Sequence, residues 1–228
     1  MSRSEAIKNH FESEAKEFDE RVLKIIPYYT EMLDALLLAV PFAEDSSFEA
    51  IDLGSGTGTV AKLLKERFPK AKITCLDFSE KMLQIAKGKL QNFSDVSYKS
   101  ANFLEFEFDP KYDLVISSLA LHHLESDEIK RDFFKKILEA LKPKGIFYNA
   151  DVVLASSEKL QTKYMEKWAN FTAKNLSAAE VQNNLVRYKN EDMPAKLTDQ
   201  LNWLAEIGFK EVEVIWKYYN FAVYGGVK

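Results

Sequence analysis

One stretch of the chain, residues 51–58, restricts the fold more than any other part of the sequence. It reads Ile-Asp-Leu-Gly-Ser-Gly-Thr-Gly, with apolar or small residues at Phe48 and Ala50 before it and an amphipathic segment after it. Glycine lacks a Cβ, so it can adopt positive φ and lets the backbone approach a ligand closely. A strand that ends in such a loop and then opens a helix presents backbone amides and the positive end of a helix dipole. The stretch therefore predicts a nucleotide-binding corner.

Apolar, strand-like segments alternate with amphipathic, helix-like segments along the middle of the chain. The expected strands cover 48–53, 72–77, 96–99, 112–118 and 146–153. The unbroken apolar run in 112–118 is typical of a strand covered on both faces. Two final strands, 210–217 and 220–227, are separated by so few residues that they must pair as an antiparallel hairpin. We therefore predict an α/β fold with a doubly wound, mostly parallel sheet of seven strands that ends in this hairpin.

The helical segments outside this pattern are expected to form a cap. Helical spacing covers residues 3–24 and about 28–40, and a polar, aromatic helical region at 155–195 interrupts the alternation. The N-terminal arm either folds over the site as a lid or packs on the edge of the sheet. We expect one domain whose four parts are a helical lid, a cofactor-binding core, a helical insert, and a last helix with the hairpin: 1–45, 46–154, 155–195 and 196–228.

Charge and cysteine content restrict the partners and the compartment. The net charge is −4 and the isoelectric point is near 5.6, so the whole chain has no bulk attraction to nucleic acid or anionic membrane. The longest apolar run, residues 35–40, is too short to span a bilayer, and the polar N-terminus does not resemble a signal peptide. The single cysteine, Cys75, excludes an intramolecular disulfide. We predict a cytoplasmic protein with no membrane segment, for which a nucleic-acid partner is disfavoured.

The glycine spacing distinguishes between nucleotide ligands. A dinucleotide fingerprint has glycines at relative positions 1, 3 and 6, whereas Gly54, Gly56 and Gly58 occupy positions 1, 3 and 5. Asp52 precedes the first glycine, and its carboxylate would repel a pyrophosphate but attract an ammonium group. The terminal hairpin also departs from the all-parallel dinucleotide fold. These features favour S-adenosylmethionine over NAD.

Several motifs occur in the order that is found in class I S-adenosylmethionine-dependent methyltransferases, and the chain resembles that family. The motifs are Asp-Leu-Gly-Ser-Gly-Thr-Gly, Asp77, Asn102 and Tyr-Asp-Leu-Val-Ile-Ser-Ser; the resemblance covers about residues 48–152 and resumes in the last helix and hairpin. It implies S-adenosyl-L-methionine as cofactor and S-adenosyl-L-homocysteine as product. It also implies which residues contact each part of the cofactor. The amino-acid end would contact Asp52, Gly54, Ser55 and Gly56, and the ribose would contact Asp77. The adenine would contact Phe78, Met82, Asn102 and Phe103, and the methylthio end would contact Ser118 and Leu119.

A closer resemblance involves both ends of the chain. Phe-Asp-Glu-Arg-Val at 18–22 and the closing Leu-Ala-Glu-Ile-Gly-Phe and Phe-Ala-Val-Tyr-Gly-Gly are similar to the branch that contains the carboxy-S-adenosylmethionine synthases of tRNA wobble-uridine modification and uncharacterised small methyltransferases. In the synthases an arginine of the insert holds the extra carboxylate; here Leu185 stands at that place and Arg187 is displaced by about two positions. We expect a methyltransferase acting on a small-molecule acceptor. A synthase-like enzyme is the second hypothesis, and a non-catalytic cofactor-binding subunit is the third.

Methyl transfer from a sulfonium is an in-line displacement, so the protein mainly aligns the reacting atoms in a dry pocket. A base is needed only if the nucleophile carries a proton. His122 and His123 follow the fourth strand, and they are either the catalytic residues or simply the start of the next loop. Adjacent histidines with one distant cysteine match no metal-ligand spacing, so no metal is expected.

The aromatic insert and the related synthases predict a homodimer. The lid and insert offer four residues for acceptor binding: Arg21, Tyr28, Tyr29 and Arg187.

Overall fold

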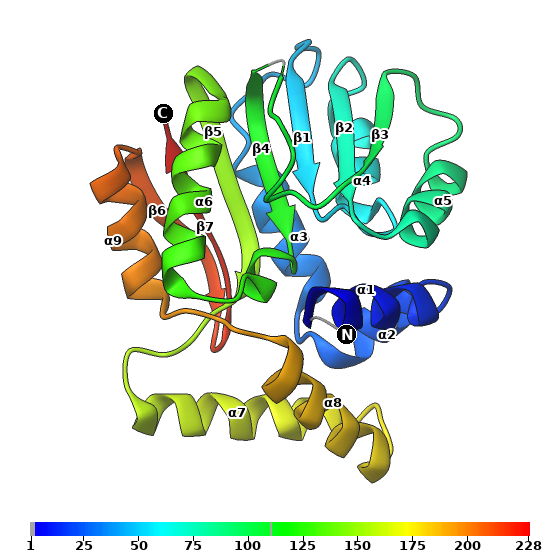
Figure 1. Cartoon of the computed structure of the whole chain (residues 1–228), viewed down its shortest axis with the longest axis vertical. Helices are drawn as coiled ribbons and strands as arrows, with labels where there is room; N and C mark the ends of the chain where they lie inside the picture. The colour runs from blue at the N-terminus through cyan, green and yellow to red at the C-terminus, as the bar shows by residue number, and fades with distance from the viewer. Residues whose placement is uncertain (1–2, 110) are drawn as a thin grey trace.

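The computed structural model describes residues 3–109 and 111–228, and a seven-stranded sheet forms the centre of this described part (Figure 1). The strands are β1 (Glu49–Leu53), β2 (Lys72–Asp77), β3 (Val96–Ser100), β4 (Tyr112–Ser118), β5 (Leu141–Val152), β6 (Lys210–Tyr218) and β7 (Phe221–Val227). Their order is β3-β2-β1-β4-β5-β7-β6; β1 to β5 are parallel to one another, and β7 is antiparallel to both of its neighbours. The predicted doubly wound sheet with a terminal hairpin is confirmed.

Helices cover both faces of the sheet. One face carries α3 (Tyr29–Leu38), α4 (Thr59–Arg67) and α5 (Glu80–Lys89), and the other carries α6 (Asp127–Ala140) and α9 (Leu197–Ile207). The side chains of β4 show the consequence, because Leu114 and Ile116 belong to the core beneath the first group of helices and Val115 belongs to the core beneath the second. Alternate side chains of a strand point to opposite faces, so a strand buried on both sides has no polar positions to alternate with.

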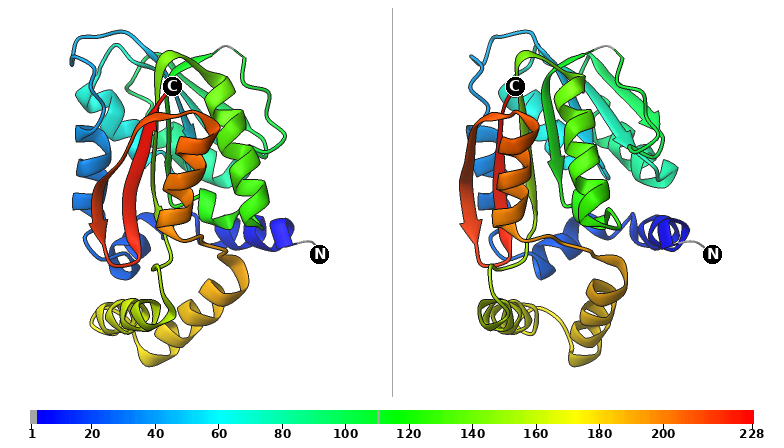
Figure 2. Two further views of the ribbon diagram at one scale, coloured as in Figure 1. Left: turned by 90° about the vertical axis from the view of Figure 1, so that its left-hand side faces the viewer. Right: turned by 60° about the vertical axis from the view of Figure 1, so that its left-hand side comes forward.

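The remaining helices lie beyond the edge of the sheet where the parallel strands end (Figures 1 and 2). They are α1 (Arg3–Glu14), α2 (Phe18–Ile25), α7 (Glu158–Thr172) and α8 (Ala178–Glu191), and a single 3₁₀ turn (Leu121–His123) follows β4. In open α/β sheets this edge is the one that binds ligands. Among the described residues, no helix combines the length and the apolar character needed to cross a bilayer.

Serine side chains fix where several of these helices begin. Ser79 Oγ accepts a hydrogen bond from the amide of Met82, and Ser126 Oγ accepts one from the amide of Ile129. Ser177 forms a full capping box at the start of α8. Each cap satisfies an amide that has no partner within the helix. α5 therefore begins directly after Ser79.

Two segments differ from the expected pattern. The single helical pattern over 3–24 divides into α1 and α2, because the chain turns at 15–17, where the Glu17 amide donates to the Glu14 carbonyl at 3.0 Å. This turn places the rings of Phe11 and Phe18 6.1 Å apart, so that both helices contribute an aromatic side chain to one cavity.

The second difference is the start of β5. The sequence Lys-Pro-Lys-Gly at 142–145 is expected to end the preceding helix, but it forms the first, irregular part of the strand. The pairing with β4 shifts register between Tyr112 and Leu114, and Lys144 has a φ of +65°. The extra residues are accommodated as a bulge, a local insertion that sequence periodicity does not reveal.

The close approach of β7 to β5 can be tested at Gly225, where an added Cβ would lie 1.9 Å from the carbonyl oxygen of Phe147. We expect Gly225→Ala to force the strands apart and to lower the free energy of unfolding by about 1–3 kcal/mol, as measured by urea denaturation. Gly88→Ala is the control: nothing lies within 4 Å of its added Cβ, and it should stabilise α5 by up to about 1 kcal/mol. Equal stability of the two variants would contradict this packing.

Candidate active site

The carboxyl ends of β1, β2 and β4 open onto a cavity of about 290 Å³. Tyr29, expected to contact the acceptor, lines this cavity, and Ile7 and Phe11 of α1 with Phe18 of α2 cover it. The residues for which the sequence implied cofactor contacts all lie in its wall: Asp52, Gly54, Ser55, Gly56, Asp77, Phe78, Met82, Asn102, Phe103, Ser118 and Leu119. The fold therefore brings these residues into one site, and their contacts with a ligand stay a prediction.

The glycine loop between β1 and α4 has a backbone conformation that favours glycine. The φ angle is +68° at Gly54 and +52° at Gly56, and a Cβ on Gly54 would lie 2.3 Å from the Cβ of Ala120. The amides of Gly54 and Ser55 donate to the carbonyl of Leu76 at 2.8 and 3.0 Å, which ties the loop to the end of β2. The absence of side chains at these positions leaves the backbone itself as the wall of the cavity.

Asp52 is a buried carboxylate. Its side chain is 1% exposed, and neither of its oxygens makes a hydrogen bond of good geometry with the described residues. Burial and the charge of Asp77 raise the pKa of Asp52 to about 7, and the nearby backbone of Ala61 acts against this rise. An unpaired buried carboxylate is costly, so this position favours a ligand with a positively charged group.

Asp77 is also buried, but its two oxygens are held by backbone amides. Oδ2 accepts a hydrogen bond from Gly56 and Oδ1 accepts one from Ser79, both at 2.8 Å. Burial raises the pKa of Asp77 to about 6, and these amides limit the rise because they stabilise the charged form. The amides fix the carboxylate at the mouth of the glycine loop with lone pairs left for a ligand.

Aromatic rings and one amide line the far side of the first cavity. Phe78 packs edge-on against Phe11 with ring centroids 6.5 Å apart, and Phe103 lines the same wall. The side-chain oxygen of Asn102 accepts a hydrogen bond from the Leu104 amide at 3.0 Å. An amide oxygen has two lone pairs, so Asn102 can still accept one hydrogen bond from a ligand.

The chain leaves β4 in an unusual conformation at Leu119, whose φ is +53°. Positive φ is uncommon for a residue with a branched side chain and marks a position that the surrounding structure must enforce. The Leu119 amide donates to the Ala150 carbonyl at 2.9 Å, and the neighbouring Ser118 Oγ is buried with no hydrogen-bond partner in the part of the chain that the structure describes. Leu119 lines both the first cavity and a second one, so it stands where the two meet.

The second cavity has a volume of about 130 Å³ and lies between the N-terminal helices and the insert. Arg21 and Arg187, two of the four residues expected to bind the acceptor, line it. Tyr29 lines the first cavity instead. Tyr28 lines neither of these cavities; it is 51% exposed and packs edge-on against Tyr218.

The arginines of the second cavity are held by polar partners. Arg187 Nη1 donates to Glu14 at 2.5 Å, and Arg21 Nε lies 3.3 Å from the same carboxylate. Arg21 also donates to the side-chain oxygen of Asn184 at 2.5 Å, while the buried Nδ2 of Asn184 has no partner among the described residues. A free amide donor in a cavity with aromatic walls suits a small polar ligand.

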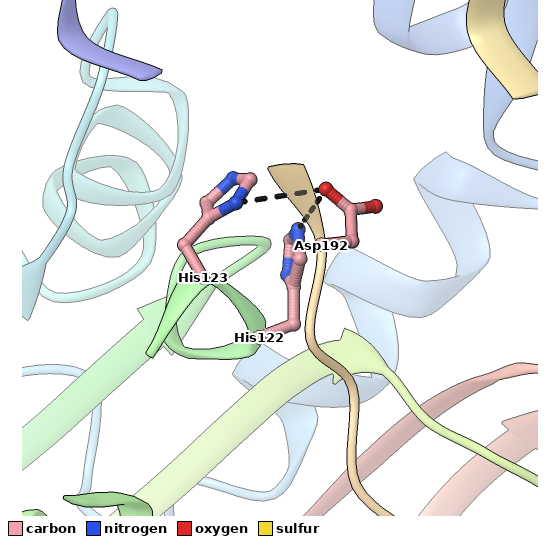
Figure 3. A group of neighbouring side chains, drawn as sticks. All are labelled: His122, His123 and Asp192. Carbon is pink, nitrogen blue, oxygen red and sulfur yellow. Dashed lines mark ion pairs between the residues drawn. The ribbon is translucent and has the colours of Figure 1, made fainter. Parts of the chain in front are cut away.

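The two histidines after β4 face an acidic residue of the insert (Figure 3). His122 Nδ1 lies 2.5 Å from Asp151 Oδ1, and His122 Nε2 and His123 Nδ1 each lie 3.6 Å from Asp192 Oδ1. His123 Nδ1 is also 3.0 Å from the carbonyl oxygen of Glu191. Burial acts to lower the pKa of His122, but the charges of Asp151 and Asp192 outweigh it and raise the pKa to about 10. Burial and the neighbouring His122 lower the pKa of His123 to about 4.

Sequence reasoning missed the acidic partners of these histidines. Asp151 gives one signal, because it is the one charged residue of the expected strand 146–153 and such a residue indicates a buried partner. Asp192 gives none, because only the fold of the insert brings it to the histidines. Of the pair, His123 lines both cavities and His122 lines the second.

Sequence reasoning also missed a contact that fastens α2 to the glycine loop. Asp19 accepts hydrogen bonds from Thr57 Oγ1 and from Lys89 Nζ, both at 2.6 Å, and from Thr59 Oγ1 at 3.2 Å. The residues come from α2, the glycine loop, α4 and α5, so their sequence positions do not indicate the contact. It holds the N-terminal helices against the first cavity.

A sheet of this order, with a glycine loop and two buried carboxylates at its ligand-binding edge, defines a nucleotide-dependent methyltransferase fold. The family described as "Methyltransferase domain" matches residues 50–145. The carboxy-S-adenosyl-L-methionine synthase of Campylobacter hominis is 31% identical, over 96% of this chain and 94% of its own. The synthase of Sulfurimonas denitrificans is 27% identical, over 99% and 97%. The chain belongs to the class I S-adenosylmethionine-dependent methyltransferase family, whose cofactor is S-adenosylmethionine.

Solved structures agree with this fold. Human N-acetylserotonin methyltransferase in complex with SAM has a TM-score of 0.64 and 19% identity, over 95% of this chain and 56% of that chain. An O-methyltransferase family protein from Burkholderia thailandensis has a TM-score of 0.68 and 15% identity, over 94% and 59%. At this identity the likeness concerns the fold alone.

The unpaired carboxylate of Asp52 predicts opposite effects on stability and on binding. The unfolded chain loses this proton near pH 4, whereas the folded protein keeps it to about pH 7, so the folded state loses stability as the pH rises through this interval. We expect Asp52→Asn to raise the Tm of the ligand-free protein at pH 8, by about 2–4 °C for each kcal/mol recovered. We also expect it to weaken S-adenosylhomocysteine binding at least about tenfold, because a charge-assisted contact is lost.

Differential scanning calorimetry and isothermal titration calorimetry measure the two effects, and Asp45→Asn, at an exposed aspartate, is the control. The gain in Tm should shrink as the pH falls toward 4 and vanish below it, where both states hold the proton. A variant that is no more stable than wild type at pH 8, or that binds the nucleotide equally well, would contradict the assignment.

Proposed function

We propose that this protein transfers a methyl group from S-adenosylmethionine to a small-molecule acceptor. The observation that carries the proposal is the pair of cavities that meet at Leu119. The first is lined by the residues expected to contact the cofactor, and the second is a separate space of about 130 Å³. A space of this size accommodates a small molecule, and the helices at 3–25 and 158–191 enclose it. The first helices act as a lid and the insert as the other half of a cap.

The wall of the first cavity fits the cofactor group by group. The orphaned carboxylate of Asp52 matches the α-ammonium group, and Asp77, fixed by two amides, matches the ribose hydroxyls. The rings of Phe78 and Phe103, with the free lone pair of Asn102, suit the adenine. The bound cofactor would supply an electrophilic methyl group on a sulfonium, and the residues around Leu119 would direct that end toward the second cavity.

The chain contributes alignment, exclusion of water and contact with the acceptor. Phe11, Phe18, Leu119 and His123 line both cavities, so they surround the line along which the methyl group moves. Three of these side chains are apolar and keep water from the reacting atoms, which favours an in-line displacement. The fourth residue, His123, provides the catalytic contact with the acceptor together with His122.

A second hypothesis, a carboxy-S-adenosylmethionine synthase-like activity, is supported by the names of the relatives. Two features of the insert argue against it. Leu185, at the place expected for the carboxylate-binding arginine, packs partly buried against the core of the protein. Arg187, which lies in the second cavity, already pairs with Glu14. We therefore keep methyl transfer first, in a cytoplasmic protein, with a homodimer as a further prediction from the aromatic insert.

The acceptor class can be tested with S-adenosylmethionine labelled in the methyl group and a cell extract separated into small molecules, RNA and protein. We expect the label to enter the small-molecule fraction. Asp77→Ala should reduce this transfer about 100-fold, since hydrogen bonds from a charged group to the ribose contribute about 1.5–3 kcal/mol each. Asp45→Ala should transfer normally. Label in RNA or protein would contradict the proposal, and no transfer from an extract would favour a non-catalytic subunit.

The two enzymatic hypotheses predict different nucleotides. Mass spectrometry of the nucleotide released from the purified protein should show S-adenosylmethionine or S-adenosylhomocysteine, because no unpaired arginine awaits an extra carboxylate in the second cavity. A nucleotide heavier by one carboxyl group would instead establish the synthase-like reading.

A further inference from the structure

We propose that His122, His123 and Asp192 bind a divalent first-row transition-metal ion in the second cavity. One ligand atom of each residue lies within 4.8 Å of the others, and Asp192 Oδ1 is 3.6 Å from both His122 Nε2 and His123 Nδ1 (Figure 3). Nitrogen or oxygen ligands of a tetrahedral metal, at about 2.0–2.1 Å from the ion, are about 3.3 Å apart. Small side-chain rotations would bring the three atoms to that spacing.

The orientation of His122 is the one that metal-binding histidines adopt. Its Nδ1 lies 2.5 Å from Asp151 Oδ1, and its backbone amide donates to Asp151 Oδ2 at 2.9 Å. A carboxylate on one ring nitrogen fixes the tautomer and leaves the other nitrogen, Nε2, free to bind a metal. Nε2 is the atom that faces Asp192, so Asp151 acts as a positioning residue for the site.

The charges around the cluster also suit a divalent cation. Asp151 and Asp192 hold a proton on His122 in the metal-free protein, and an ion that displaces this proton would balance the two carboxylates. The carbonyl of Glu191 accepts a hydrogen bond from Arg3 Nη2 at 2.6 Å and lies 3.0 Å from His123 Nδ1, so an ion bound to Nδ1 would replace the proton that Nδ1 donates to this carbonyl. Arg3 therefore contributes positive charge near the cluster, and this charge acts to lower the pKa of Asp192. Two imidazoles exclude Mg²⁺ and Ca²⁺, which prefer oxygen.

Three protein ligands leave coordination positions open, and all three residues line the second cavity. Two histidines and one carboxylate with open positions form an arrangement that binds substrates or water. This step rests on the proposed function: the acceptor would be a chelating molecule whose oxygen or sulfur nucleophile binds the ion beside a second donor atom. Binding lowers the pKa of that group, its proton leaves to solvent, the S–CH₃ bond breaks and a bond from the methyl carbon to the nucleophile forms.

Metal content and Co²⁺ binding test the site without any acceptor. Purified protein should contain about one equivalent of transition metal by plasma mass spectrometry, and metal-free protein should bind Co²⁺ with visible absorption bands. Asp192→Asn and His122→Ala should weaken Co²⁺ binding about 100-fold or more. Asp151→Asn should weaken it about 10–100-fold, because the ligands stay but lose their support. His10→Ala is the control, since His10 lies in the same cavity outside the cluster.

S-Adenosylhomocysteine binding separates this proposal from the proposed function. Asp192→Asn should bind the nucleotide as wild type does, which also shows that the variant is folded. No Co²⁺ binding by wild type, or equal binding by wild type and Asp192→Asn, would overturn the metal site and leave methyl transfer untouched. Co²⁺ binding with no nucleotide binding would keep the metal site and overturn the methyltransferase proposal.

Discussion

The interaction on which the site depends is the placement of two buried carboxylates, Asp52 and Asp77, on neighbouring parallel strands. The carboxylate of Asp52 is buried without a hydrogen bond among the described residues, which costs stability, whereas Asp77 accepts hydrogen bonds from the amides of Gly56 and Ser79. Burial raises the pKa of both groups, so each gains from a ligand that carries a positive charge or donates hydrogen bonds. A buried carboxylate that lowers the stability of the fold indicates a role in ligand binding.

The cap turns this nucleotide corner into two connected spaces. Asp19 fastens α2 to the glycine loop through Thr57 and Lys89, and the same helices separate the first cavity from the second. Three of the four side chains that line both cavities are apolar. In this arrangement the cavity at the glycine loop binds the cofactor that the family shares, and the helices of the cap determine which acceptor fits.

The sequence predicted the parts of the protein that depend on local chemistry. β2 and β4 were predicted with the bounds that the structure shows, because each is a short apolar run between polar residues, and the eleven cofactor-type residues share one cavity because parallel strands end at one edge. The break between α1 and α2 and the bulge at the start of β5 were not predicted, since tertiary packing decides them. Asp192 and Asp19 were missed for the same reason: their partners are distant in sequence.

A crystal structure with S-adenosylhomocysteine would test the central claim most directly. The account predicts that the ammonium group of the nucleotide lies within hydrogen-bond distance of Asp52, that the ribose hydroxyls meet Asp77, and that the sulfur faces Leu119 and the second cavity. A nucleotide whose sulfur points away from the second cavity, or that leaves Asp52 without a partner, would contradict it.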